Sequence, residues 1–111
     1  MSDGEAVRRG DVIVAEMSDA RGREIRKRRP YVVVSPDDMN AARFAYLAAP
    51  LTTGHHPYRF RVPCEVLGRR GHVVLDQLYT IDARAVRRPV ARIGPATVRA
   101  ALLLLREMFA D

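Results

Sequence analysis

One basic segment of the sequence contains residue types that could bind and cleave a phosphodiester. Between Arg21 and Arg29, six of the nine residues are Arg or Lys, and the only acid is Glu24. An Arg guanidinium can bond two phosphate oxygens at once, and a carboxylate among cations stays ionised and can accept a proton. The alternative is a solvated surface on which Glu24 forms weak exposed ion pairs. The segment is therefore a candidate phosphate-binding loop.

Two polar pairs, Thr52 with Thr53 and Asp76 with Gln77, each follow an apolar run. A Thr after a strand usually bonds its own backbone, and an Asp in that position usually caps a turn. The same hydroxyl and carboxylate could instead contact a substrate held by the basic loop. Neither pair is diagnostic alone.

The histidines and the single cysteine indicate no metal centre. His55 and His56 are adjacent, which is a poor geometry for sharing one ion, and His72 has no acid or thiol at ligand spacing. The lone Cys64 excludes an intramolecular disulfide and a cysteine-rich zinc site, and it fits a reducing cytosol. We expect neither a metal nor another cofactor.

The elements that must position these residues are mainly strands. Polar loops are expected at 18–29 and 51–57, a turn at Gly71, and a short helix that begins at Pro36 with Ser35 as its N-cap. Apolar or alternating runs predict strands at 11–17, 30–35, 45–50, 58–62, 72–75 and 90–93. Many short strands with one terminal helix indicate a mainly β (α+β) fold, a small barrel of bent antiparallel strands.

The terminal helix is expected to open at Gly94 and Pro95 and to pack on the sheet. Its packing face is predicted from apolar residues at helical spacing, namely Val98, Ala101, Leu102, Leu105, Met108 and Phe109. Leu103 and Leu104 widen this face, which indicates either a contact between subunits or deeper burial within one subunit.

The composition narrows the class of protein. The 111 residues fit a single domain, 1–111, and 19 Lys and Arg against 13 Asp and Glu give a net charge of +6. Polyanions are therefore the expected partners. The N-terminus is polar, and the longest apolar run, 100–105, is too short to span a bilayer. We expect a cytoplasmic protein that contacts no membrane.

Taken in order, the motifs resemble the MazF/PemK (Kid) family of toxin ribonucleases. Arg9-Gly10-Asp11 resembles the family's Gly-Asp-hydrophobic start, and the segment from Arg21 to Pro30 matches the spacing of a loop that ends in Arg-Arg-Pro. Three later stretches resemble a Ser-Pro-x-x-x-Asn turn, a Pro-[apolar]-Thr-[Ser/Thr] segment and an Asp-Gln-x-Arg-Thr-Ile-Asp block: Ser35 to Asn40, Pro50 to Thr53, and Asp76 to Asp82. The resemblance runs from Arg9 to the terminal helix.

This resemblance implies an SH3-like barrel with an appended helix, a homodimer, and sequence-specific cleavage of single-stranded RNA by the toxin of a type II toxin-antitoxin system. By position, Arg29 and Thr52 would be the catalytic pair, assisted by Glu24. The RNA contacts would come from Arg21, Arg23, Arg26, Lys27, Arg28, Thr53, His55, His56, Asp76, Gln77 and Tyr79. A cognate acidic antitoxin, folding as it binds, would lie across the basic loops, and DNA would be reached only through the antitoxin.

The residue types suit this chemistry. RNA supplies its own nucleophile, the 2′-hydroxyl, so the enzyme needs only to align that group and stabilise the negative charge of the transition state. Arg29 suits the second task, and Thr52 can donate to another phosphoryl oxygen or position the leaving group. The products would be a 2′,3′-cyclic phosphate and a 5′-hydroxyl. The general base stays open between Glu24, Asp76 and a loop His, because Arg is a poor base.

Four positions depart from the family pattern. Ile25 replaces a Gln and Lys27 replaces a Gly in the basic loop. Val74 stands where some members place a catalytic Arg, which weakens the case for Asp76 as a catalytic residue. Tyr79 replaces an Arg and could either stack on a base or belong to the core.

Two other functions fit the same fold. A CcdB-like gyrase-inhibiting toxin would use the barrel without catalysis, but that group relies on a C-terminal Trp segment and this chain has no Trp. A non-catalytic nucleic-acid-binding barrel would also account for the charge. The ribonuclease hypothesis requires the Arg29 guanidinium and the Thr52 hydroxyl to converge on one accessible cleft.

Overall fold

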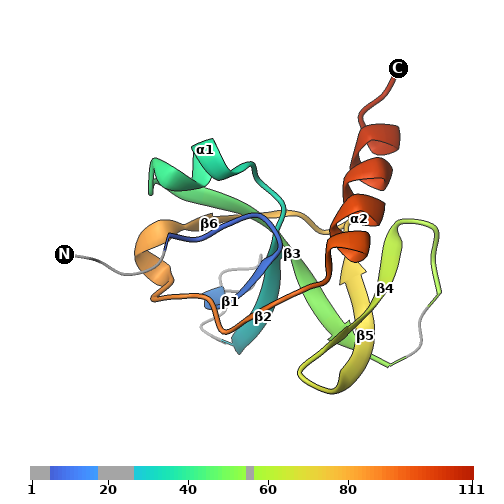
Figure 1. The fold of residues 1–111 in the computed structure, drawn as a ribbon, viewed down its shortest axis with the longest axis horizontal. Helices are drawn as coiled ribbons and strands as arrows, with labels where there is room; N and C mark the ends of the chain where they lie inside the picture. The colour runs from blue at the N-terminus through green and yellow to red at the C-terminus, as the bar shows by residue number, and fades with distance from the viewer. Residues whose placement is uncertain (1–5, 18–26, 55–56) are drawn as a thin grey trace.

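The computed structural model describes residues 6–17, 27–54 and 57–111. The strands are β1 (Asp11–Met17), β2 (Lys27–Val33), β3 (Ala45–Thr53), β4 (Arg61–Val66), β5 (Arg69–Val74), β6 (Tyr79–Asp82) and β7 (Ala91–Arg92). The helices are α1 (Asp37–Ala41), a 3-10 turn η1 (Ala83–Ala85) and α2 (Pro95–Met108). Figure 1 shows these elements along the chain.

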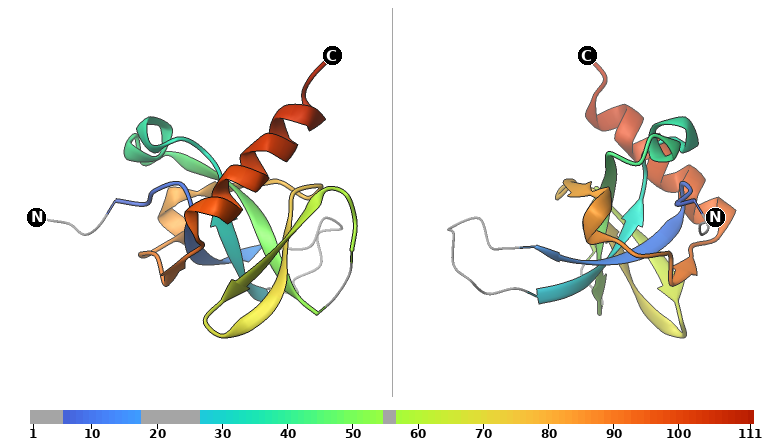
Figure 2. Two further views of the ribbon diagram at one scale, coloured as in Figure 1. Left: turned by 45° about the vertical axis from the view of Figure 1, so that its right-hand side comes forward. Right: turned by 90° about the vertical axis from the view of Figure 1, so that its left-hand side faces the viewer.

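The strands form one antiparallel sheet that curls into a half-barrel. The order is β4-β5-β3-β2-β1-β7, and β6 pairs with the first part of β3. β3 belongs to both halves of the sheet: it pairs with β2 and β6 first and with β5 afterwards. Figures 1 and 2 show α2 lying over the end of the sheet formed by β4 and β5. The predicted mainly β fold with a C-terminal helix is confirmed.

The central strands are buried on both faces. Because side chains alternate along a strand, Val12 and Val32 join an apolar cluster beneath α2, whereas Ile13 and Tyr31 join a second cluster on the opposite face. This explains why the middle of β1 and the last part of β2 appear in the sequence as continuous apolar runs.

The ends of several elements differ from the sequence prediction. β2 begins at residue 27 rather than 30, so part of the expected loop is paired with β1. The strand predicted at 58–62 is wrong at its start, because residues 59–60 form a turn and β4 runs from 61 to 66. The turn expected at Gly71 lies instead at residues 67–68, and Gly71 is inside β5. β6, at 79–82, was not predicted.

The predicted terminal helix is confirmed as α2. It starts at Pro95 after the N-cap Gly94, and Val98, Leu105 and Met108 pack on the sheet. The prediction that Phe109 belongs to the packing face is wrong, because Phe109 is the C-cap and is 74% exposed. Leu103 is also exposed, whereas Leu104 packs on the core.

The Arg9-Gly10-Asp11 motif joins three elements. Asp11 is buried, accepts a hydrogen bond from the backbone of Arg8, and pairs with Arg92 of β7 at 2.6 Å. Gly10 has φ +93°, and a Cβ there would lie 3.0 Å from a methyl group of Val98 in α2. The motif is therefore structural, since it fixes the start of β1 against β7 and α2.

The expected N-cap role of Ser35 is wrong. Pro36 is the N-cap of α1, and the Ser35 hydroxyl is buried, donates to Asn40 at 2.6 Å and accepts from the backbone N–H of Leu47 at 3.1 Å. The Asn40 amide donates back to the Ser35 carbonyl at 3.0 Å. This buried network ties α1 to β3.

No helix in the described ranges has the length and apolar character needed to cross a bilayer.

Replacing Asn40 with Ala should lower the free energy of unfolding by about 2 kcal/mol, because it leaves buried polar groups of Ser35 without partners. Asp38→Ala, on the exposed side of the same helix, should cost less than about 0.5 kcal/mol. Urea unfolding of both variants measures the difference, and equal losses would contradict the proposed importance of the network.

Candidate active site

A cleft opens where β2 and β3 separate. The two strands pair up to Tyr31 and Pro50, and from Leu51 onward β3 pairs with β5 instead. If the first register had continued, Arg29 would lie opposite Thr52. Because β2 and β3 diverge there, Arg29 and Thr52 do not pair with each other, and they border an opening between the two strands.

The cleft has a volume of about 700 Å³ and combines apolar walls with a basic rim. Its apolar lining includes Val12, Val14, Pro30, Leu51, Val66, Leu67 and Val90. Its cationic lining is Arg28, Arg29, Arg69 and Arg70, all from exposed positions. Such a surface suits an anion that also carries flat or apolar groups.

Arg29 and Thr52 both line this cleft. Arg29 shares a face of β2 with Tyr31, and Thr52 shares a face of β3 with Pro50. Their neighbours Pro30, Leu51 and Thr53, which alternate with them, also line the cleft. Arg29 is exposed, and its charge reaches the phenol of Tyr31: burial and Tyr79 raise the pKa of Tyr31, whereas the Arg29 guanidinium opposes that rise. The sequence-predicted pair thus shares one cleft.

The Thr52 side chain is less accessible than that of Arg29. The residue is half-buried, and its hydroxyl oxygen is buried without a hydrogen bond to the described part of the chain. A threonine has staggered χ1 states, so a rotation could turn this hydroxyl toward a ligand.

Gly71 sets the distance between β5 and β3 at this point. It pairs with Thr53, and a Cβ at position 71 would overlap the backbone carbonyl of Thr52. The sequence pattern predicted a turn at Gly71, and that prediction is wrong. Its actual role is to allow close backbone approach beside the candidate catalytic hydroxyl.

The Asp76-Gln77 pair does not line the cleft. Both residues are exposed in the connection between β5 and β6, and Asp76 lies 3.5 Å from Arg61. Val74, where an Arg was noted in some relatives, is buried. Tyr79 packs edge-on against Tyr31, with ring centroids 5.4 Å apart, at the margin of the second apolar cluster.

Thr53 and Arg28, two of the predicted RNA-contacting residues, line the cleft. Lys27 begins β2 and pairs with Met17. The remaining predicted site residues lie outside the described ranges: Arg21, Arg23, Glu24, Arg26, His55 and His56.

Arg69 and Arg70 were missed by the sequence analysis, although they bring two cations to the cleft. The signal was present as an Arg pair after the Leu67-Gly68 turn. Cys64 also lines the cleft, and burial raises the pKa of its thiol, which disfavours the nucleophilic thiolate. Within the described chain, no group of three His, Cys, Asp or Glu residues could hold a metal ion.

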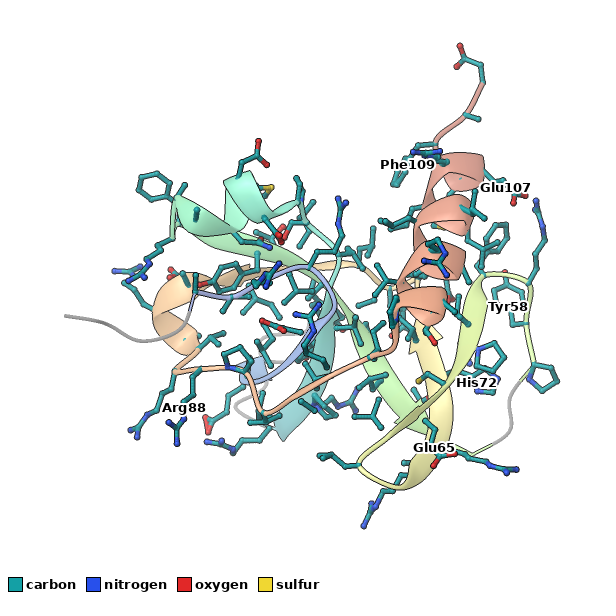
Figure 3. All side chains as sticks on the ribbon, in the orientation of Figure 1. Tyr58, Glu65, His72, Arg88, Glu107 and Phe109 are labelled. Carbon is teal, nitrogen blue, oxygen red and sulfur yellow. The ribbon has the colours of Figure 1, made fainter. Side chains whose placement is uncertain are left out.

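A second hollow, which we call the outer hollow, lies on the opposite face of β4 and β5. It has a volume of about 780 Å³ and is lined by Gly54, Pro57, Tyr58, Arg61, Pro63, Cys64, Glu65, Arg70, Gly71 and His72. Tyr58 contacts Phe60 edge-on at 5.8 Å. Figure 3 labels two residues of this lining, Tyr58 and His72, on the side of α2 where β4 and β5 lie, whereas Arg88 is on the other side of the molecule.

The loop that leads into β4 is attached to the end of α2. Arg59 pairs with Glu107 at 2.6 Å, and its guanidinium also lies 4.6 Å from the ring centre of Phe60. Both partners of the ion pair are exposed, so the pair contributes little to stability but limits where this loop can lie.

Comparison with known proteins gives a consistent result. The sequence pattern of a family described as the PemK-like, MazF-like toxin of type II toxin-antitoxin systems matches residues 8–109. A toxin candidate from Mycobacterium tuberculosis, Rv3098A, is 38% identical over 74 residues, which cover 66% of this chain and 68% of that protein.

Two solved structures share the fold. The MazE-MazF structure (Form-II) from Deinococcus radiodurans contains a chain that superposes with a TM-score of 0.79 at 24% identity, covering 95% of this chain and 96% of the other. An endoribonuclease in complex with its cognate antitoxin, from a mycobacterial species, superposes with a TM-score of 0.75 at 21% identity, covering 92% and 93%.

Replacing Gly71 with Ala should lower the free energy of unfolding by about 3 kcal/mol, because β5 must move away from the Thr52 carbonyl. Gly68→Ala is the matched control: it lies in a turn with φ +76° and open space around it, so only a backbone cost of about 1 kcal/mol is expected. Chemical denaturation measures both losses. A Gly71 variant as stable as the Gly68 variant would show that the close approach is not required.

Proposed function

Because the chain belongs to the family of PemK-like, MazF-like toxins of type II toxin-antitoxin systems, we propose that it is a metal-independent, sequence-specific endoribonuclease acting on single-stranded RNA. The observation that carries this proposal is the position of Arg29 and Thr52 on the wall of one cleft with a basic rim. The endoribonuclease with the same fold supports it.

In the proposed reaction, the 2′-oxygen of one nucleotide forms a bond to the adjacent phosphorus while the bond from phosphorus to the 5′-oxygen breaks. The 2′-hydroxyl proton passes to a general base, and the 5′-oxygen gains a proton. This gives a 2′,3′-cyclic phosphate and a 5′-hydroxyl. The Arg29 guanidinium would bond the phosphoryl oxygens as their negative charge increases.

Thr52 would act as a second donor to the phosphoryl group. Its hydroxyl is buried and would have to rotate about χ1 to reach that group. Asp76 does not line the cleft and lies beside Arg61. Glu24 and the loop histidines therefore stay the candidates for the general base, and we assign Asp76 a supporting role in RNA binding.

The cationic rim would bind the RNA backbone on both sides of the scissile bond. Arg28 lies on one wall, and Arg69 and Arg70 lie on the other. The predicted contacts from Arg21, Arg23, Arg26, Lys27, Thr53, His55, His56, Gln77 and Tyr79 remain part of this proposal.

The same basic surface would bind the antitoxin. We propose that an acidic segment of the cognate antitoxin covers the cleft and excludes RNA, and two neighbours of the same fold come from a MazE-MazF structure and an antitoxin complex. We also keep the homodimer as a proposal, with DNA contacted only through the antitoxin. The exposed Leu103 on α2 is available for a contact between subunits.

Removing either catalytic side chain should abolish most RNA cleavage. With a labelled single-stranded RNA pool in EDTA, Arg29→Ala and Thr52→Ala should each lower kcat by about 10²- to 10³-fold, because each removes a donor to the transition state. Arg88→Ala and Thr80→Ala remove the same groups from exposed positions outside the cleft, and both should cleave like the wild type. Binding without cleavage by the wild type would favour the non-catalytic nucleic-acid-binding barrel.

The rim arginines should determine the salt dependence of RNA binding. Arg69→Ala should reduce the slope of log Kd against log salt by about 0.7, the value for one contact with a single-stranded phosphate. Fluorescence anisotropy on an RNA that the protein cannot cleave, carrying 2′-O-methyl groups, measures the slope. An unchanged slope would remove Arg69 from the binding surface, and Arg88→Ala again serves as the charge-matched control.

A further inference from the structure

His72 occupies the middle of a row of three side chains that crosses three strands. It pairs with Pro63 of β4 on one side and with Thr52 of β3 on the other. Directly opposed residues of antiparallel strands share a face, with Cβ atoms about 4.5–5.5 Å apart. His72 is only 6% exposed, and the strand register places it between Pro63 and the candidate catalytic threonine.

The Thr52 hydroxyl requires a group that orients it. The oxygen is buried and bonds to no described residue, and a buried hydroxyl without a partner is costly. His72 is the directly opposed neighbour that carries polar side-chain atoms. Cβ atoms at this separation leave room for an imidazole nitrogen and a threonine oxygen to approach within hydrogen-bond distance.

The other charged or titratable groups near His72 line the outer hollow, and the acids there are paired. From β4 come Arg61 and Glu65, from β5 comes Arg70, and from the preceding loop comes Tyr58. Glu65 lies 3.9 Å from Arg70, and Arg61 lies 3.5 Å from Asp76. Thr52 is the hydroxyl partner that β3 presents to the imidazole.

Resting on the proposed ribonuclease function, we propose that His72 is a positioning residue for Thr52. After a change of side-chain rotamer, an imidazole N–H donates to the hydroxyl oxygen of Thr52, so the hydroxyl hydrogen is directed toward a phosphoryl oxygen. The contribution of Thr52 to catalysis therefore depends on an N–H donor at position 72.

The contact can be tested without measuring RNA cleavage. The imidazole nitrogen NMR signals of His72, assigned by their absence in His72→Gln, are compared at one pH in the wild type, Thr52→Val and Thr53→Val. Loss of the Thr52 oxygen should shift these signals, because an imidazole N–H loses its acceptor. Thr53 lies on the opposite face of β3, so its variant should give the wild-type signals. Identical signals in all three proteins would overturn the proposal, whether or not the protein cleaves RNA.

Kinetics test the positioning role. His72→Leu should lower kcat by about tenfold with little change in KM, because it removes one hydrogen bond to a catalytic group. His72→Gln retains an N–H donor and should restore part of kcat. Gln and Leu variants of equal kcat would overturn the role. If the wild type cleaves no RNA, the proposed function fails, and the NMR comparison alone decides the contact.

Discussion

The candidate site depends on one close backbone contact, where Gly71 of β5 lies against Thr52 of β3. At Leu51, β3 changes its pairing partner from β2 to β5, and this change opens the cleft beside Arg29. The change requires β5 to come so near to β3 that a Cβ at position 71 would overlap the Thr52 carbonyl. The same glycine thus allows the sheet to curl and sets the position of the threonine.

The motifs that resemble a toxin family divide into two physical classes. Gly10 with Asp11, and Ser35 with Asn40, hold elements together through buried hydrogen bonds and a close contact with α2. Arg29 and Thr52 lie instead where β2 and β3 diverge, so they no longer pair with each other across those two strands. The structural motifs therefore hold neighbouring elements together. The proposed catalytic residues lie where β3 changes its pairing partner.

The charge of the molecule is arranged around this opening. Arginines from β2 and β5 face the cleft from its two walls, although they are separated by about 40 positions in the sequence. Lining of this kind raises the local concentration of a polyanion, and the apolar walls between the cations favour a ligand with flat bases over a simple anion. A single-stranded nucleic acid has both properties. An acidic peptide with apolar side chains would compete for the same surface.

Local patterns in the sequence determined the fold class, the central strands and the terminal helix, because β-branched runs and helical spacing depend on neighbouring residues. Arg29 and Thr52 were predicted as a catalytic pair from the family resemblance. The sequence did not reveal the row of Pro63, His72 and Thr52, the arginines at 69 and 70, or the real role of Gly71. Those features depend on which strands pair and in which register, and a shift of one residue would move every side chain to the other face. Only the tertiary structure decides that register, because it results from contacts between segments far apart in the chain.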